Sequence, residues 1–181
     1  MKHNKLIILD RDGVINHDSD DYIKSPDEWF PIDGSAKAIA LLNQAGYTVG
    51  VATNQSGLGR GFYDENMLTK IHHKMKQHLE TENASLDQIE FCPDHPNNPG
   101  PNRKPSPGMV LKLLNVFSAD PASTWFVGDT LADVHCAINS GCKPALVRTG
   151  KGKRTLAKTE FKQLDVPVFD DLADFVQFLL K

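Results

Sequence analysis

Short apolar runs alternate with amphipathic stretches along the chain, and turn-forming residues separate one from the next. The first run, Leu6–Leu9, contains no polar residue and leads directly into Asp10 and Asp12, after which Gly13 follows. A short unbroken apolar run with turn residues at its end is typical of a strand buried on both faces of a parallel sheet. Comparable runs predict five further strands, at residues 48–52, 86–92, 125–127, 144–147 and 167–169.

Between these runs, apolar residues recur at spacings of three and four, which predicts helices with one buried face. The predicted helices begin near Ser35, Phe62, Ser106, Asp133 and Leu172. Strands that alternate with helices indicate an α/β fold, here a three-layer, Rossmann-like parallel sheet with helices on both faces. No insertion is long enough for a large cap domain and no linker is evident, so we expect residues 1–181 to form a single domain.

Some polar segments carry no clear signal of function. The proline-rich segment from Pro93 to Pro105 and the basic segment from Arg148 to Lys158 are both predicted to be loops. His72, His73 and His78 lie on or beside the long predicted helix, without a matching set of metal ligands. We expect all three to be ordinary surface histidines.

Composition and charge exclude several classes of function. The chain of 181 residues is 40% hydrophobic with a formal net charge of −3, so it offers no basic surface for nucleic acid and no polybasic membrane patch. No apolar stretch approaches the length of a transmembrane span. The three cysteines are too few and too scattered for a disulfide framework. We therefore expect a cytoplasmic monomer that acts on a small molecule.

Chemically useful side chains follow four of the predicted strands or the loop after one. Asp10 and Asp12 follow the first strand, Thr53 the second, Lys104 the loop after the third, and Asp129 the fourth. Singly, each has an ordinary explanation as an acidic turn, a capping residue or a surface lysine. The carboxyl ends of parallel strands converge on one edge of the sheet, however, so together these residues predict a single site.

This combination suits phosphoryl transfer assisted by Mg²⁺. Phosphoryl oxygens require hydrogen-bond donors and a fixed cation, which Thr53 and Lys104 supply, and Mg²⁺ prefers carboxylate ligands such as Asp10 and Asp129. A carboxylate can also attack phosphorus and form an aspartyl-phosphate. A second acid, Asp12, can protonate the leaving oxygen and then deprotonate water, and such proton transfer contributes roughly 10²–10⁴-fold to a rate.

Four segments resemble the motifs of the haloacid-dehalogenase-like (HAD) phosphatases, in the same order and at similar spacing across nearly the whole chain. They are Asp10–Ile15, Thr53–Ser56, Arg103–Pro105 and Gly128–Asp133. Within that superfamily the chain is most similar to the D-glycero-D-manno-heptose 1,7-bisphosphate 7-phosphatase group. The resemblance implies an enzyme that removes the 7-phosphate of this sugar in the synthesis of nucleotide-activated heptose for lipopolysaccharide.

The resemblance also implies roles for individual residues. Asp10 is the implied nucleophile and Asp12 the acid/base, while Thr53 and Lys104 stabilise the phosphoryl group. Asp10, the main-chain carbonyl of Asp12 and Asp129 are the implied magnesium ligands. The residues assigned to substrate binding are Asp18, Asp21, Asn54, Gln55, Ser56, Arg103 and Thr130.

The chain departs from the family pattern in two places. Relatives often carry a zinc loop with four cysteine or histidine ligands, whereas here only Cys92 and His95 are present, and His95 is one position late. Structural zinc requires four such ligands, so we predict that zinc is absent. Thr130 stands where some heptose phosphatases have a lysine, which leaves the choice of substrate less certain than the reaction.

Three alternatives remain open at this point. Histidinol-phosphate phosphatases share the implied catalytic residues. A phospho-receiver signalling domain uses similar groups but places its phosphorylated aspartate after the third strand, where this chain has Cys92-Pro93-Asp94. A catalytically silent phosphate-binding protein is disfavoured because both Asp10 and Asp12 are present.

Overall fold

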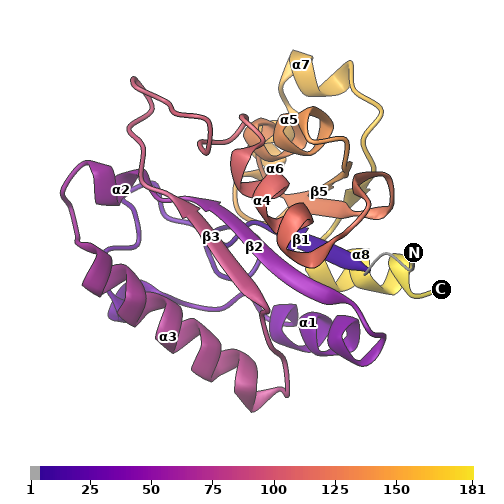
Figure 1. Cartoon of the computed structure of the whole chain (residues 1–181), viewed down its shortest axis with the longest axis horizontal. Coiled ribbons are helices and arrows are strands. Elements are labelled where there is room, and N and C mark those ends of the chain that lie inside the picture. The colour runs from indigo at the N-terminus through magenta and orange to yellow at the C-terminus, as the bar shows by residue number, and fades with distance from the viewer. Residues whose placement is uncertain (1–4) are drawn as a thin grey trace.

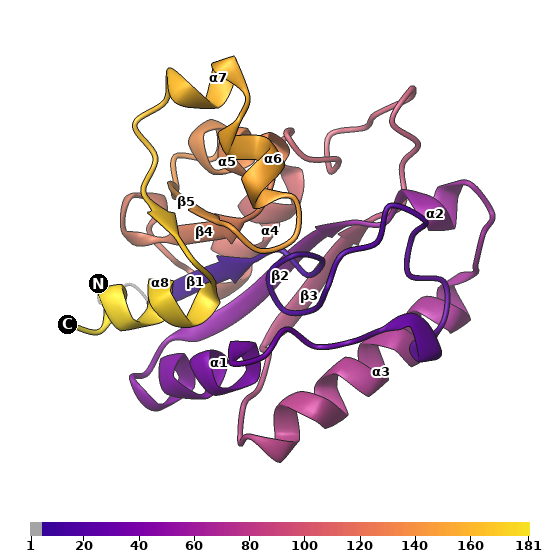
Figure 2. The same cartoon turned by 180° about the vertical axis from the view of Figure 1, so that it is seen from behind.

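The apolar runs form a parallel sheet that lies between two layers of helices (Figures 1 and 2). A computed structural model describes residues 5–181. The sheet has six strands in the order β3-β2-β1-β4-β5-β6, and every neighbouring pair is parallel. The strands are β1 (Leu6–Leu9), β2 (Thr48–Asn54), β3 (Gln88–Cys92), β4 (Trp125–Gly128), β5 (Lys143–Val147) and β6 (Val168–Phe169).

Helices connect the strands and cover both faces of the sheet. They are α1 (Ser35–Gln44), α2 (Ser56–Gly59), α3 (Glu65–Thr81), α4 (Gly108–Phe117), α5 (Leu131–Asn139), α6 (Gly152–Leu156), α7 (Thr159–Lys162) and α8 (Leu172–Leu179), with short 3-10 turns at Pro26–Glu28 and Pro121–Ser123. Within residues 5–181, no helix has both the length and the apolar character needed to cross a membrane.

The central strand β1 shows why the first apolar run has no polar position. Ile7 and Leu9 pack into the core that α1, α3 and α8 cover, whereas Leu6 and Ile8 pack into the core under α4 and α5. Successive side chains of a strand point to opposite faces, so a strand covered on both sides must be apolar throughout. The predicted three-layer α/β fold without a large cap domain is confirmed.

Several predicted boundaries differ from the structure; the helix expected near Asp133, for example, begins at Leu131, because Thr130 caps it. The long helix begins at Glu65 rather than at Phe62, because the carboxylate of Asp64 accepts a hydrogen bond from the amide of Met67 (2.7 Å) and caps the helix. The segment from Arg148 to Lys158 is not simply a loop, because it contains α6. The absence of a regular apolar stripe in this five-residue helix explains why the pattern missed it.

The strand order places the predicted chemistry at one point of the sheet. The chain builds β1, β2 and β3 outward in one direction and then returns to add β4 on the other side of β1. Ligands of open α/β sheets bind where the order reverses in this way, outside the carboxyl ends of the strands. The amide of Asp10 donates to the carbonyl of Val127 (2.9 Å), so the ends of β1 and β4 lie side by side at this reversal.

Candidate active site

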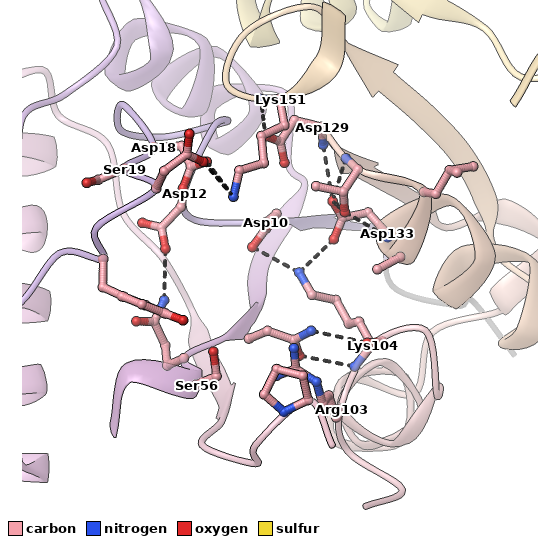
Figure 3. Close-up of a pocket in the computed structure, with 18 of the residues that line it drawn as sticks. Asp10, Asp12, Asp18, Ser19, Ser56, Arg103, Lys104, Asp129, Asp133 and Lys151 are labelled. Carbon is pink, nitrogen blue, oxygen red and sulfur yellow. Dashed lines mark hydrogen bonds and ion pairs between the residues drawn. The ribbon is translucent and has the colours of Figure 1, made fainter. Parts of the chain in front are cut away.

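A cleft of about 420 Å³ opens at the carboxyl edge of the sheet, within the size range usual for small-molecule sites (Figure 3). Among the predicted site residues, those that line it are Asp10, Asp12, Asp18, Asn54, Gln55, Ser56, Arg103, Lys104, Asp129 and Thr130. Thr53 and Asp21 are not among the lining residues. Thr53 is buried and its hydroxyl accepts a hydrogen bond from Gln55 (3.0 Å), while Asp21 is exposed on the neighbouring loop.

Lys104 joins two carboxylates at the floor of the cleft. Its Nζ lies 2.9 Å from Oδ1 of Asp10 and 2.6 Å from Oδ1 of Asp133, and it also donates to the carbonyl of Ala52 (2.9 Å). Burial alone would lower the pKa of Lys104, but the two carboxylates raise it above its ordinary value, so the lysine is a permanent cation. The arrangement fixes a positive charge beside the proposed nucleophile.

Asn54 holds this lysine in place through its main chain. Its Oδ1 accepts from the amide of Lys104 (3.1 Å), and its Nδ2 donates to the carbonyl of the same residue (3.2 Å). The two segments are fifty residues apart in the chain, so this paired contact fastens the loop after β3 to the end of β2. Asn54 therefore positions Lys104, in addition to lining the cleft.

Asp129 lies in a space that only glycine leaves open. A Cβ on Gly13 or on Gly150 would overlap the carboxylate of Asp129, and both glycines have positive φ angles (+86° and +56°). The amide of Lys151 donates to Oδ2 of Asp129 (2.7 Å), and the hydroxyl of Thr155 donates to its carbonyl (2.8 Å). The loop after β1 and the start of α6 therefore contact Asp129 from two sides.

The carboxylates at this edge fit a divalent cation. Asp10, Asp129 and Asp133 each offer an oxygen, and these oxygens lie within 4.8 Å of one another. Oδ1 of Asp129 is buried and has no hydrogen-bond partner among the residues that the structure describes. Burial, followed by the neighbouring carboxylates, raises the pKa values of Asp10 and Asp129. A hard cation such as Mg²⁺ would satisfy the orphaned oxygen and offset this repulsion.

Asp12 has a different environment from its neighbour Asp10. Its carboxylate accepts from Nε and Nη2 of Arg11 (2.9 and 3.0 Å), from Asn16 (2.8 Å) and from Gln55 (3.0 Å). Burial alone would raise its pKa, but the charge and hydrogen bonds of these donors hold the pKa below its ordinary value. Because these donors surround the carboxylate, the main-chain carbonyl of Asp12 is the group that fits the metal role that the resemblance implies.

Ion pairs at the rim connect the loop after β1 to α6 and the residue before it. Nζ of Lys151 lies 3.1 Å from Asp18 and 3.6 Å from Asp20, and Arg154 donates through both terminal nitrogens to Asp20. Thr130, next to Asp129, caps α5 and donates its hydroxyl to Asp133 (2.7 Å). The rim thus contains both charges, and Lys151 and Arg154 are ion-paired there with Asp18 and Asp20.

Sequence reasoning missed several residues that the fold brings to the site. The sequence predicts Asp133 only as the start of a helix within a motif, but the residue is 1% exposed and ion-paired to Lys104. The expectation of a surface histidine is wrong for His72, whose Nε2 lies 3.3 Å from Nη1 of the fully buried Arg11. For Arg11, the one signal in the sequence is its position as a charged residue directly between Asp10 and Asp12. Nothing in the local sequence distinguished His72 from His73.

Comparisons with known proteins agree with this geometry. Residues 101–175 match the family model described as HAD-hydrolase-like. The chain is 48% identical to the D-glycero-β-D-manno-heptose-1,7-bisphosphate 7-phosphatase of Neisseria meningitidis serogroup A over 98% of this chain and 95% of the relative. It is 47% identical to the enzyme of the same name from Pseudomonas aeruginosa, over 97% and 98% of the two chains.

A solved structure is similar as well. The D,D-heptose 1,7-bisphosphate phosphatase from B. bronchiseptica, complexed with magnesium and phosphate, superposes with a TM-score of 0.91 at 46% identity, covering 97% of this chain and 98% of that one. The chain therefore belongs to the HAD-like hydrolases, within the D-glycero-D-manno-heptose-1,7-bisphosphate 7-phosphatase group. It is a phosphoric monoester hydrolase, which removes the phospho-receiver alternative.

Proposed function

We propose that the protein uses Mg²⁺ and an aspartyl-phosphate intermediate to remove the 7-phosphate of D-glycero-β-D-manno-heptose 1,7-bisphosphate, in the synthesis of nucleotide-activated heptose. The observation that carries the mechanism is the contact of Asp10 with Lys104 (2.9 Å) at the topological reversal of the sheet. The names of the relatives, which cover the same length of chain, support the choice of substrate.

In the first step, a carboxylate oxygen of Asp10 attacks phosphorus. The bond from phosphorus to the ester oxygen breaks, and the leaving alkoxide takes a proton from Asp12. Because the donors around Asp12 favour its ionised form in the free enzyme, this step requires Asp12 to be protonated in the substrate complex. Both described partners of Asp10, the amide of Arg11 and Nζ of Lys104, contact Oδ1, so we assign the attack to Oδ2. Lys104 would stabilise the negative charge of the transferring phosphoryl oxygens.

In the second step, water replaces the enzyme on phosphorus. The ionised Asp12 removes a proton from the water, whose oxygen attacks the aspartyl-phosphate, and the bond to Asp10 breaks to release inorganic phosphate. The donors around Asp12 favour its ionised form, which suits this step. Thr53 is buried beside Gln55 and would act by supporting that side chain rather than by lining the cleft.

The cation would be held by Asp10, Asp129 and the carbonyl of Asp12, with Asp133 close by to hold Lys104. When bound, Mg²⁺ supplies charge stabilisation at the phosphoryl oxygens. The second phosphate of the sugar would be recognised by cations of the rim. Arg103, Lys151 and Lys158 line the cleft in addition to Lys104.

We also propose that the protein works as a single-domain cytoplasmic monomer without zinc. Cys92 is buried in the core beneath α4, and Nδ1 of His95 accepts a hydrogen bond from the amide of Asn97 (3.1 Å). The core packing of Cys92 and the hydrogen bond of His95 within its own loop support the proposal that they hold no zinc. Metal analysis of the purified protein and its sedimentation in solution test these two points.

Phosphate release in the presence of Mg²⁺ tests the reaction. Both anomers of heptose 1,7-bisphosphate are compared with histidinol phosphate and fructose 1,6-bisphosphate. We expect a strong preference for the β-heptose, abolished by Asp10→Asn, which preserves the size of the side chain. Equal slow release from every ester would leave a general phosphatase, and preference for histidinol phosphate would support that alternative instead.

A further inference from the structure

The guanidinium of Arg11 lies behind Asp12 and has no exposed surface. Two of its nitrogens hold the carboxylate of Asp12 through parallel hydrogen bonds of 2.9 and 3.0 Å, and Nη2 also donates to Oε1 of Gln55 (3.1 Å). The remaining nitrogen, Nη1, faces His72 at 3.3 Å. His72 comes from α3, which lies outside all four recognised motifs.

The chemistry of arginine fixes the direction of this last contact. A guanidinium has donors and no acceptor, so Nε2 of His72 must be the acceptor, and the neutral ring carries its proton on Nδ1. Burial, followed by the charge of Arg11, lowers the pKa of His72 to about 3, which agrees with a neutral ring. The ring also packs edge-on against Phe91, with 6.4 Å between centroids, so its position is defined from two sides.

The same network determines the orientation of Gln55. Its Oε1 accepts from Arg11 and from the hydroxyl of Tyr63 (2.7 Å), which directs its Nε2 toward Asp12 (3.0 Å). Three of the donors to Asp12 therefore come from two side chains whose orientations depend on one another. Loss of the acceptor at His72 would leave Nη1 of Arg11 buried without that partner, and because a buried unpaired donor is costly, the guanidinium would be held less firmly in this orientation.

We propose that His72 is a positioning residue for the proton-transfer steps: by accepting a hydrogen bond from Arg11, it fixes the guanidinium that orients the carboxylate of Asp12. This inference rests on the proposed function, because it assigns the acid/base role to Asp12. His72 itself is not among the residues that line the cleft, so it acts through Arg11. His72 thus brings a residue of α3 to a site otherwise built from segments at the strand ends.

Two classes of phosphate ester separate this role from a structural one. An alkyl ester such as the heptose bisphosphate needs a proton on its leaving oxygen, whereas p-nitrophenyl phosphate releases a stable phenolate without one. His72→Leu removes the acceptor, His72→Gln keeps an acceptor oxygen near the position of Nε2, and His73→Leu is the control at the exposed neighbouring position of α3.

We expect His72→Leu to lower kcat/KM for the alkyl ester about tenfold, with less than about a twofold change for p-nitrophenyl phosphate. His72→Gln should restore the ratio of the two values to near that of the wild type, and His73→Leu should leave it unchanged. Equal losses on both esters would show that His72 is only structural, and no loss on either would also overturn the proposal.

The NMR signal of the Arg11 Nε–H group gives an independent measure. In His72→Leu it should shift or broaden relative to the wild type, and in His72→Gln it should stay near the original position. An unchanged signal in His72→Leu would overturn the positioning role even if activity fell. If the wild type hydrolyses neither ester, the proposed function fails, and this signal still decides whether His72 holds Arg11.

Discussion

The half-buried His72 gives a quantitative prediction about stability and pH. In the unfolded chain the pKa of His72 is about 6.5, whereas in the folded protein it is about 3 because of burial and the charge of Arg11, with Lys76 adding to the effect and Asp12 opposing it. Below the unfolded pKa, the unfolded chain binds a proton that the folded chain does not. The contribution of His72 is therefore fully present above pH 6.5 and is lost as the pH falls toward 3.

The expected size follows from the two pKa values. At pH 5 the unfolded state gains about 2 kcal/mol from protonation of this residue, and about 1–2 kcal/mol after allowance for the partial exposure of the ring. His72→Gln cannot be protonated. Its free energy of unfolding relative to the wild type should therefore rise by this amount between about pH 7.5 and pH 5.

Urea unfolding, followed by tryptophan fluorescence in metal-free buffer at the two pH values, measures this difference. His73→Gln controls for the loss of one histidine from α3. A difference in the free energy of unfolding between wild type and His72→Gln that is the same at both pH values would refute the assignment of His72 as a neutral acceptor. A difference of the opposite sign would show that the folded protein binds the proton more tightly than the unfolded chain.

Three further predictions concern the cation and the nucleophile. Gly13→Ala adds a Cβ that overlaps the carboxylate of Asp129 at a positive φ, so isothermal titration should show weakened Mg²⁺ binding together with a loss of activity. Lys104→Met leaves Asp10 and Asp133 without their shared cation, and thermal unfolding with kinetics should show lost stability and a fall in kcat of about 10²–10³-fold. Removal of Mg²⁺ by EDTA should stop phosphate release, and added Mg²⁺ should restore it, whereas recovery that required zinc would contradict the proposed metal.

The fold was predictable because its signals are local. Each strand is a short apolar run and most helices have a clear buried stripe, so the alternation gave the three layers without knowledge of strand order. The helix α6 escaped because it is five residues long and is stabilised by contacts from elsewhere, such as the hydrogen bond from Thr155 to the carbonyl of Asp129. Such contacts leave no periodic pattern in the sequence.

The candidate site was likewise predictable only where its signals are local. Residues directly after a strand, such as Asp10 and Asp129, could be placed because the carboxyl ends of parallel strands meet. The partners that set their chemistry could not: His72 reaches Arg11 from a helix sixty-one residues away, and Asp133 meets Lys104 only once the loop after β3 is in place. When two side chains from distant segments pair, the sequence around neither of them indicates the contact.

The position of β1 between β2 and β4 has a consequence for motion. A strand with hydrogen-bonded neighbours on both sides has no edge to fray, and the amides of such central strands exchange with solvent only when much of the domain opens. The rim differs, because exposed pairs such as Asp20 with Arg154 can open locally. Amide hydrogen exchange should therefore be slowest in β1, which leads into Asp10, and fast in residues 18–21. The rim can then adapt to a sugar while the reacting carboxylate stays fixed.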